Sequence, residues 1–214
     1  MKSVKLKNTI TAAGALMAWL AVLVQLVLML QNRVTAVPET IVRFFSFFTI
    51  LTNILVAVCF SSLWLKRKNS NLPTFFTPAR QTAVAVYIMV VGIIYNAILR
   101  FLWAPAGLQR IVDEGLHLLV PLLFFVYWLI FVNKSNLIWQ NAFRWLAYPF
   151  VYLVFILIRG GIAATAYYPY PFVDVSKLGY EKVFINSLGI LFLFLLLSYI
   201  FIALGRFVRP QKNK

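Results

Sequence analysis

Residues 183–205, VFINSLGILFLFLLLSYIFIALG, form an apolar stretch without a charged side chain. A helix of about 20 such residues crosses the hydrocarbon core of a bilayer. Stretches of similar length precede it at about 8–30, 41–65, 79–103, 114–132 and 145–166. The sequence therefore predicts six membrane-spanning segments.

The predicted spans must be helices. Backbone polar groups in lipid need partners within the chain, which restricts spanning structures to helices and closed barrels. The spans lack the alternation of apolar and polar residues that a barrel strand requires. Because the connections are too short for a soluble domain, we expect an all-α protein. Residues 1–214 are predicted to form a single domain, a bundle of six transmembrane helices.

The composition agrees with a membrane protein and excludes several other classes. Hydrophobic residues make up 63% of the chain and charged residues 12%, whereas soluble domains have about 25% charged residues. The net charge is +15, which in a soluble protein would suggest binding to nucleic acid. Because the chain is so apolar, a nucleic-acid-binding protein is not expected. A single cysteine, Cys59, excludes an internal disulfide and a cysteine metal cluster.

The basic residues predict the orientation. Cytoplasmic loops of membrane proteins carry an excess of lysine and arginine. Most basic residues fall on one side of the membrane if the N-terminus is cytoplasmic: Lys2, Lys5, Lys7, Lys66, Arg67, Lys68, Arg80, Lys134, Arg144, Arg206, Arg209, Lys212 and Lys214. Both termini are therefore predicted to face the cytoplasm.

Polar residues of the spans gather in the predicted outer leaflet, roughly 5–18 Å below the surface at a rise of 1.5 Å per residue. They include Arg43, Ser46, Thr49, Thr52, Asn53, Asn96, Arg100, Asp113, Glu114, His117, Tyr152, Arg159 and Asn186. The inner halves of the spans carry few comparable groups, which argues against a path through the membrane. Charged groups at such depth usually face a bundle interior or a water-filled cavity. We expect a polar pocket open to the outer leaflet.

The chemistry available in this layer is that of hydroxyl groups. A hydroxyl from Thr49, Thr52 or Ser46 is a candidate nucleophile, and the single histidine, His117, is the candidate base. Either Asp113 or Glu114 is spaced to orient that histidine. Arg100, Arg159 and the asparagines Asn53, Asn96 and Asn186, with Tyr152, are candidates for binding or supporting an anionic ligand. Thr49 is preferred to Thr52, because its spacing places it on one helix face with Arg43, Ser46 and Asn53.

Each residue also has a purely structural interpretation. A single buried histidine is often a hydrogen-bonded structural residue, and hydroxyls in membrane helices often bond the carbonyl four residues back. Arg100 can extend to the interface, and the two asparagines of the second and third spans can join helices. The segment YYPYPF, residues 167–172, is interpreted as an interfacial loop stiffened by its prolines, with a lid over the pocket as the alternative.

Several runs resemble the bacterial six-span membrane proteins of the Pr6Pr family. They are residues 47–53 (FFTILTN), 95–100 (YNAILR), 113–117 (DEGLH) with Pro121, 148–152 (YPFVY) leading to Arg159, and 168–174 (YPYPFVD). The resemblance extends from the second span to Asn186. It implies a multi-pass protein of the bacterial plasma membrane.

The plan is more distantly similar to the androgen-induced and androgen-dependent membrane hydrolases of animals. Those six-span proteins cleave fatty acid esters of hydroxy fatty acids with a threonine on an early helix and a histidine on a later one. The resemblance implies Thr49 or Thr52 as the nucleophile and His117 as its partner.

Two functions are therefore expected to compete. The first is a threonine/histidine intramembrane hydrolase of lipid esters. The alternative is a non-catalytic membrane protein, a transporter or receptor, that binds a lipid or small molecule. Both take membrane lipids as partners and a lipid or amphipathic anionic ligand in the outer leaflet. Neither needs a cofactor, and the sequence predicts no metal site.

Overall fold

A computed structural model describes residues 2–68, 75–102, 104–162 and 167–207. Within these ranges the chain is helical, with turns and short connections and no strand. The predicted span ends at 103 and 163–166, and the basic residues Arg209, Lys212 and Lys214, lie outside the described residues.

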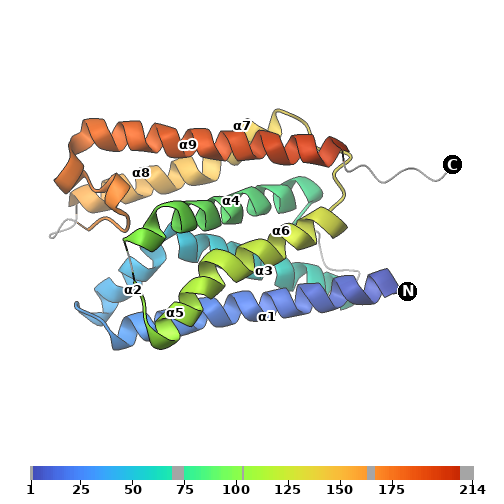
Figure 1. Ribbon diagram of the computed structural model, residues 1–214, viewed down its shortest axis with the longest axis horizontal. Helices are drawn as coiled ribbons and strands as arrows, with labels where there is room; N and C mark the ends of the chain where they lie inside the picture. Colours follow the sequence, from blue (N-terminus) through green and yellow to red (C-terminus); the bar gives the residue numbers. More distant parts are fainter. Residues whose placement is uncertain (1, 69–74, 103, 163–166, 208–214) are drawn as a thin grey trace. The chain divides into compact units, whose positions relative to one another are not determined.

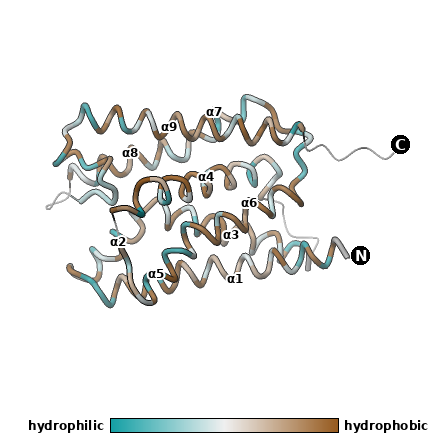
Figure 2. Tube along the Cα trace, viewed as in Figure 1, coloured by the Kyte–Doolittle hydropathy of each residue, from teal (hydrophilic) through white to brown (hydrophobic). Residues whose placement is uncertain are grey.

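Six helical stretches of the described chain are long and apolar enough to cross a membrane. They are Val4–Gln31, Phe48–Lys66, Pro78–Phe101, Gly107–Phe131, Asn141–Ile162 and Val175–Phe207. In Figure 2 hydrophobic residues predominate along these helices. The prediction of an all-α, multi-pass membrane protein is confirmed.

The chain, predicted as one domain, divides into two compact units, Met1–Asn136 and Leu137–Lys214. Four of the spans belong to the first unit and two to the second. The boundary follows Asn133-Lys134-Ser135-Asn136, which resembles the other short connections and gives no sign of a division. Each unit is described by itself.

The first unit is a ring of four long helices. Its elements are α1 (Lys2–Gln31), α2 (Val37–Ser46), α3 (Phe48–Lys68), α4 (Pro78–Ala97), η1 (Leu99–Phe101), α5 (Gly107–Glu114), η2 (Gly115–Leu119) and α6 (Val120–Phe131). Helix α3 packs between α1 and α4, and α6 closes the ring against α4 and α1 (Figure 1). Helices α5, η2 and α6 form one continuous span.

Small residues allow α1 to approach α3 closely. Gly14, Ala18 and Ala21 recur at helical spacing on α1 and are buried. Small residues promote helix association in membranes, where the gain comes from close packing. A Cβ atom built on Gly14 would lie 2.6 Å from the ring of Phe60 on α3. This contact therefore needs glycine.

The second predicted span is not continuous. Helix α2 ends at Ser46, and Phe47 is extended, with φ −80° and ψ 122°, before α3 begins. Arg43 and Ser46 therefore do not share a helix face with Thr49 as the spacing predicted. Arg43 pairs with Glu39 at 2.8 Å, and the Ser46 hydroxyl donates to the carbonyl of Val42 at 2.7 Å.

Polar groups are also buried at the opposite end of this unit, where the sequence analysis expected few. The indole of Trp128 donates to Thr82 at 2.9 Å, and the hydroxyl of Tyr127 donates to Gln81 at 3.0 Å. Trp and Tyr belong to the hydrophobic residues of the composition, but each carries a polar atom that needs a partner when buried. The network joins α4 to α6.

The second unit consists of α7 (Asn141–Trp145), α8 (Ala147–Ile162), η3 (Pro171–Val173) and α9 (Val175–Phe207). Helices α7, α8 and η3 pack against α9 or its start. Near its beginning α9 is kinked at Gly179, whose φ of 74° is accessible to glycine at little cost.

The Gly14 contact yields a prediction for stability. The Gly14→Ala substitution should lower the free energy of unfolding by about 1–3 kcal/mol through overpacking. Phe60 is fully buried and packs edge-on against Phe124 and Tyr127, so its ring cannot easily move. Thermal unfolding in detergent, followed by tryptophan fluorescence, measures the effect.

Gly189→Ala is the matched control, because nothing lies within 4 Å of a Cβ at that helical position. Its melting temperature should stay the same or rise slightly, since alanine favours helix more than glycine does. Equal melting temperatures for Gly14→Ala and the wild type would contradict the packing argument.

Candidate functional site

The fourth span contains one turn of π-helix, Gly115–Leu119, at the position of His117. The N–H of Val120 donates to the carbonyl of Gly115, five residues back, rather than to that of Leu116. Pro121 has no N–H to offer to the carbonyl of His117. The carbonyls of Leu116 and His117 therefore lose their usual α-helical donors.

Two asparagines from neighbouring helices supply donors to these carbonyls. The side-chain amide of Asn53 on α3 donates to Leu116 O at 3.2 Å, and that of Asn96 on α4 donates to His117 O at 3.2 Å. Each amide also bonds the carbonyl four residues earlier in its own helix. The asparagines thus support the π turn, as the structural interpretation of helix-joining residues predicted.

Helix α4 approaches the π turn closely because residue 92 is glycine. A Cβ atom at Gly92 would lie 3.2 Å from the carbonyl oxygen of His117 and 3.4 Å from Cβ of Pro121. A Cβ contact of 3.2 Å is tighter than about nine in ten real Cβ contacts. Gly92 therefore brings the amide of Asn96 within reach of the turn.

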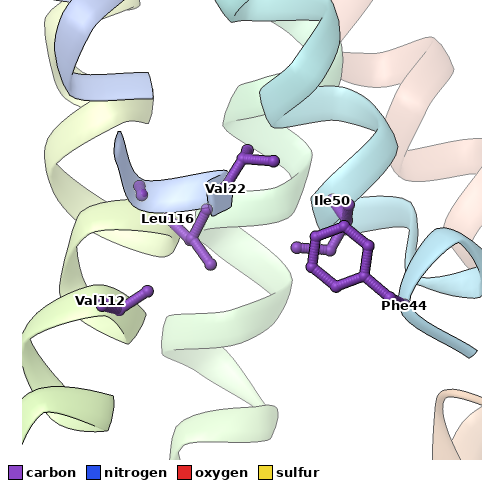
Figure 3. Close-up of a cluster of buried hydrophobic side chains, with 6 residues drawn as sticks. Val22, Phe44, Ile50, Val112 and Leu116 are labelled. Carbon is purple, nitrogen blue, oxygen red and sulfur yellow. The ribbon is translucent and has the colours of Figure 1, made fainter. Parts of the chain in front are cut away.

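A hydrophobic cluster holds the other side of the site together. It consists of Ala21, Val22, Phe44, Ile50, Val112 and Leu116 (Figure 3). Three of these residues are chain neighbours of polar ones: Ile50 follows Thr49, Val112 precedes Asp113 and Leu116 precedes His117. Packing of the cluster thereby fixes the first turn of α3 against the π turn.

Thr49, His117 and Asp113 lie in a connected row. The Oγ1 atom of Thr49 is 3.3 Å from Nε2 of His117. On the other edge of the imidazole, Nδ1 is 2.9 Å from the carbonyl oxygen of Asp113 and 3.3 Å from its Oδ1. The three residues are 7%, 9% and 7% exposed, respectively. The sequence allows either Asp113 or Glu114 as the orienting acid, and the structure places Asp113 beside the ring.

The surroundings of the ring assign its tautomer. Both groups near Nδ1 are oxygen acceptors, so a neutral imidazole carries its proton there. Nε2 is then an acceptor facing the Thr49 hydroxyl. This is the arrangement in which histidine can take a proton from a nucleophile.

Tyr95 completes the buried cluster of Thr49, His117 and Asp113. It is not among the site residues that the sequence predicts. Its hydroxyl donates to Oδ2 of Asp113. Its ring stacks on His117, with centroids 3.9 Å apart and planes 13° apart. The sequence does carry a signal for this role, because Tyr95 lies at membrane depth, directly before Asn96 and five residues before Arg100.

Arg100 and Glu114 form an ion pair at the edge of this cluster. Nη2 of Arg100 lies 2.7 Å from Oε2 of Glu114, and the guanidinium carbon is 5.4 Å from the centre of the Tyr95 ring. The Arg100 side chain is 36% exposed, but its Nε is buried and has no acceptor among the described residues. Arg100 is therefore a partly exposed cation that contacts Tyr95, the residue whose ring stacks on His117.

The remaining hydroxyls differ from Thr49. Ser46 belongs to α2 and its hydroxyl bonds the carbonyl of Val42. Thr52 is fully buried on α3. Thr49 is the hydroxyl for which the structure gives a contact with Nε2 of His117.

Three predicted site residues, Tyr152, Arg159 and Asn186, belong to the second unit and surround the loop at 167–173. Nη1 of Arg159 donates to the carbonyl of Tyr167 at 3.2 Å, and the amide of Asn186 donates to that of Phe172 at 3.0 Å. Tyr152 packs beside the cluster of Ile156, Val173 and Val183. Within their unit these residues support the loop.

The loop itself is closely packed on α8. A Cβ atom at Gly160 would lie 2.1 Å from the ring of Tyr168, so the ring fits only over glycine. The rings of Tyr170 and Phe172 stack with centroids 5.2 Å apart. These contacts agree with a stiff loop, and the lid alternative stays a prediction.

Asp174 begins α9. Its Oδ1 accepts hydrogen bonds from the backbone N–H and the hydroxyl of Ser176, and Nζ of Lys177 lies 3.5 Å from Oδ2. The hydrogen bond from the Ser176 hydroxyl, aided by the Lys177 charge, holds the pKa of the Asp174 carboxyl below its ordinary value, although its burial opposes this. The carboxylate is therefore a helix cap.

Comparisons with known proteins leave the site to be interpreted from its own geometry. No family model, curated protein or solved structure matches this chain. Within the described ranges, no group of three or more His, Cys, Asp and Glu side chains is placed to hold a metal ion. The contact of Thr49, His117 and Asp113 is the arrangement with recognisable chemistry.

The asparagine support yields a second prediction. Asn53→Ala should lower the free energy of unfolding in detergent by about 1–2 kcal/mol, because Leu116 O loses its donor in an apolar environment. Asn32→Ala is the control, since Asn32 follows the end of α1, is exposed, and bonds only Leu28 among the described residues. If both variants melt like the wild type, the carbonyl of Leu116 does not need Asn53.

The Asp174 cap yields a pH-dependent prediction. Because its pKa is lowered on folding, the cap stabilises the protein above the ordinary value of about 4, and this contribution is lost as the pH falls further. The protection factor of the Ser176 N–H, which is the exchange rate of an unstructured amide at the same pH divided by the observed rate, should therefore fall on acidification below about pH 4. In Asp174→Asn, whose amide oxygen can still accept this hydrogen bond, the protection factor should change less with acid. Equal pH profiles for both proteins would contradict a carboxylate cap.

Proposed function

We propose that this protein is an intramembrane hydrolase of lipid esters, with Thr49 as nucleophile, His117 as general base and Asp113 as the residue that orients it. The observation that carries the proposal is the position of His117, with Nε2 3.3 Å from the Thr49 hydroxyl and Nδ1 facing Asp113. A contact of 3.3 Å is long for such a pair, and catalytic hydrogen bonds often shorten when substrate binds.

In the first half-reaction, Nε2 of His117 takes the proton of the Thr49 hydroxyl while Oγ1 attacks the ester carbonyl carbon. The tetrahedral intermediate then breaks its bond to the alcohol oxygen, and His117 returns the proton to that oxygen. The products are the free alcohol and an acyl ester on Thr49. In the second half-reaction, His117 deprotonates a water that attacks the carbonyl carbon of this ester. The bond to Oγ1 then breaks, the carboxylic acid is released, and His117 returns the proton to Oγ1 of Thr49.

The position of Thr49 in the chain supports this role. Thr49 lies in the first turn of α3, two residues after the extended residue Phe47. The N-terminal end of a helix carries a partial positive charge that stabilises a developing oxyanion nearby. The break at Phe47 thus places the nucleophile at the favourable end of a helix dipole.

The depth of the site supports a lipid substrate. His117 lies ten residues into the span that starts at Gly107, roughly 15 Å along the helix at 1.5 Å per residue. An ester at this level of a bilayer belongs to a molecule that partitions into it. Arg100, partly exposed and paired with Glu114, would bind an anionic head group of that molecule.

The proposal includes the resemblances drawn from the sequence. Membership of the Pr6Pr family, a location in the bacterial plasma membrane and a mechanism like that of the androgen-induced membrane hydrolases are consistent with a threonine beside a histidine. They rest on the short motifs of the sequence, and the labelling experiment below tests the shared mechanism.

The experiment is covalent labelling of the purified protein in detergent by a fluorophosphonate, which phosphonylates an activated hydroxyl with loss of fluoride. Wild-type protein should be labelled, and mass spectrometry should place the adduct on Thr49. Thr49→Ala and His117→Ala should each lower labelling at least about 100-fold, because removal of either residue disables the pair.

Thr52→Ala and Ser46→Ala are the matched controls. Both remove a buried hydroxyl near Thr49 in sequence, and both should label at nearly the wild-type rate. Labelling that persists in Thr49→Ala, or an adduct on another residue, would refute the proposed nucleophile.

A second candidate function is binding of an anionic amphiphile without catalysis, by a transporter or receptor. The observation that favours it is the buried Nε of Arg100, which has no acceptor among the described residues. A fatty acid would then bind to the wild type and to Thr49→Ala equally well, and Arg100→Gln would abolish binding. Hydrolysis of a lipid ester by the wild type, lost in Thr49→Ala, distinguishes the enzyme from this alternative.

A further inference from the structure

Tyr95 makes two contacts that constrain the orientation of His117. It is 4% exposed, its hydroxyl donates to Oδ2 of Asp113, and its ring lies parallel to the imidazole at 3.9 Å. The first contact acts through the carboxylate and the second acts directly on the ring. Neither of these two contacts involves the Thr49 hydroxyl.

We propose that Tyr95 is a positioning residue, which keeps Nε2 of His117 directed at Thr49. The inference rests on the proposed hydrolase function and adds to it a residue outside the threonine, histidine and aspartate. An imidazole in such a site has two degrees of freedom, the tilt of its plane and the choice of the edge that faces Thr49, and Tyr95 acts on both.

The plane of the imidazole is the first degree of freedom. Stacking at 3.9 Å with planes 13° apart leaves the ring little room to tilt. Stacking alone still permits a 180° rotation about the Cβ–Cγ bond, which restores the same ring plane but exchanges Nδ1 with Cδ2 and Nε2 with Cε1. A second constraint must therefore select the edge that faces Thr49.

Asp113 provides that selection with its backbone carbonyl, which lies 2.9 Å from Nδ1 of His117, and with its carboxylate. Its Oδ1 lies 3.3 Å from Nδ1 of His117, and its Oδ2 receives the hydroxyl of Tyr95. The hydrogen bond fixes the rotation of the carboxylate, so that Oδ1 stays beside Nδ1. It also satisfies a buried carboxylate oxygen, which would otherwise be costly to keep in an apolar environment. Tyr95 thus sets the plane of the ring and the position of the carboxylate, which is one of the two acceptors of Nδ1.

The single histidine of the chain makes the test direct. Protein labelled with ¹⁵N-histidine gives one pair of imidazole nitrogen signals, whose shifts report the tautomer of His117. The ring protons of His117 report the stacked tyrosine through its ring current. Three variants separate the contacts: Tyr95→Phe keeps the stack without the hydroxyl, Tyr95→Leu removes both, and Tyr127→Phe is the control.

Tyr127 is a matched control because it is also a buried tyrosine of the first unit that donates to a side chain, Gln81, at 3.0 Å. Tyr127→Phe should leave the imidazole signals and the rate of fluorophosphonate labelling unchanged. A loss of thermal stability in this variant measures the cost of removing a buried tyrosine hydroxyl alone.

Tyr95→Phe should lower the maximal labelling rate about tenfold, the effect of one hydrogen bond to a charged group. The probe concentration for half-maximal rate should stay the same, because Tyr95 is not proposed to bind the probe. The imidazole signals should move from the single Nδ1–H tautomer toward a mixture of tautomers. Tyr95→Leu should in addition remove the ring-current shift and lower labelling further.

Unchanged imidazole signals in Tyr95→Phe would overturn the positioning role. Wild-type labelling rates in both Tyr95 variants would overturn it as well, while leaving the proposed function intact. If the wild type is not labelled at all, the proposed function fails, and the imidazole signals alone decide whether Tyr95 orients His117. The conservative Phe variant suffices for this decision if the Leu variant does not fold.

Discussion

Two backbone carbonyls that lack their usual α-helical donors shape the first unit. The π turn and Pro121 deprive Leu116 and His117 of their usual partners, and in a membrane water cannot replace them. Asn53 from α3 and Asn96 from α4 supply the missing hydrogen bonds. The need for these bonds ties two helices to the fourth span at the level of His117.

This constraint also explains the geometry of the candidate site. Because Asn53 is held to Leu116, the first turn of α3 lies beside the next residue, His117, and Thr49 is within 3.3 Å of its Nε2. π turns within α-helices are often found at functional sites. Here the turn supplies the histidine, and its supporting asparagine lies one helical turn from the threonine.

Burial of polar groups is not sufficient to define a site in this protein. The network of Gln81, Thr82, Tyr127 and Trp128 joins α4 to α6 through satisfied hydrogen bonds between neutral groups. The cluster around His117 differs in containing a base, an acid and a hydroxyl in one row. Such a network has a high energetic cost if any member loses its partner, which accounts for the number of contacts that surround His117.

The sequence by itself determined the fold class, because the length and apolarity of a spanning helix are local properties. It also supplied the histidine, the threonines and the two asparagines as candidates. The break at Phe47 has no Pro or Gly to mark it, and the role of Tyr95 depends on residues 18 and 22 positions away. Only the tertiary structure decided between Asp113 and Glu114 as the neighbour of His117, because side-chain orientation depends on packing between helices that sequence spacing does not specify.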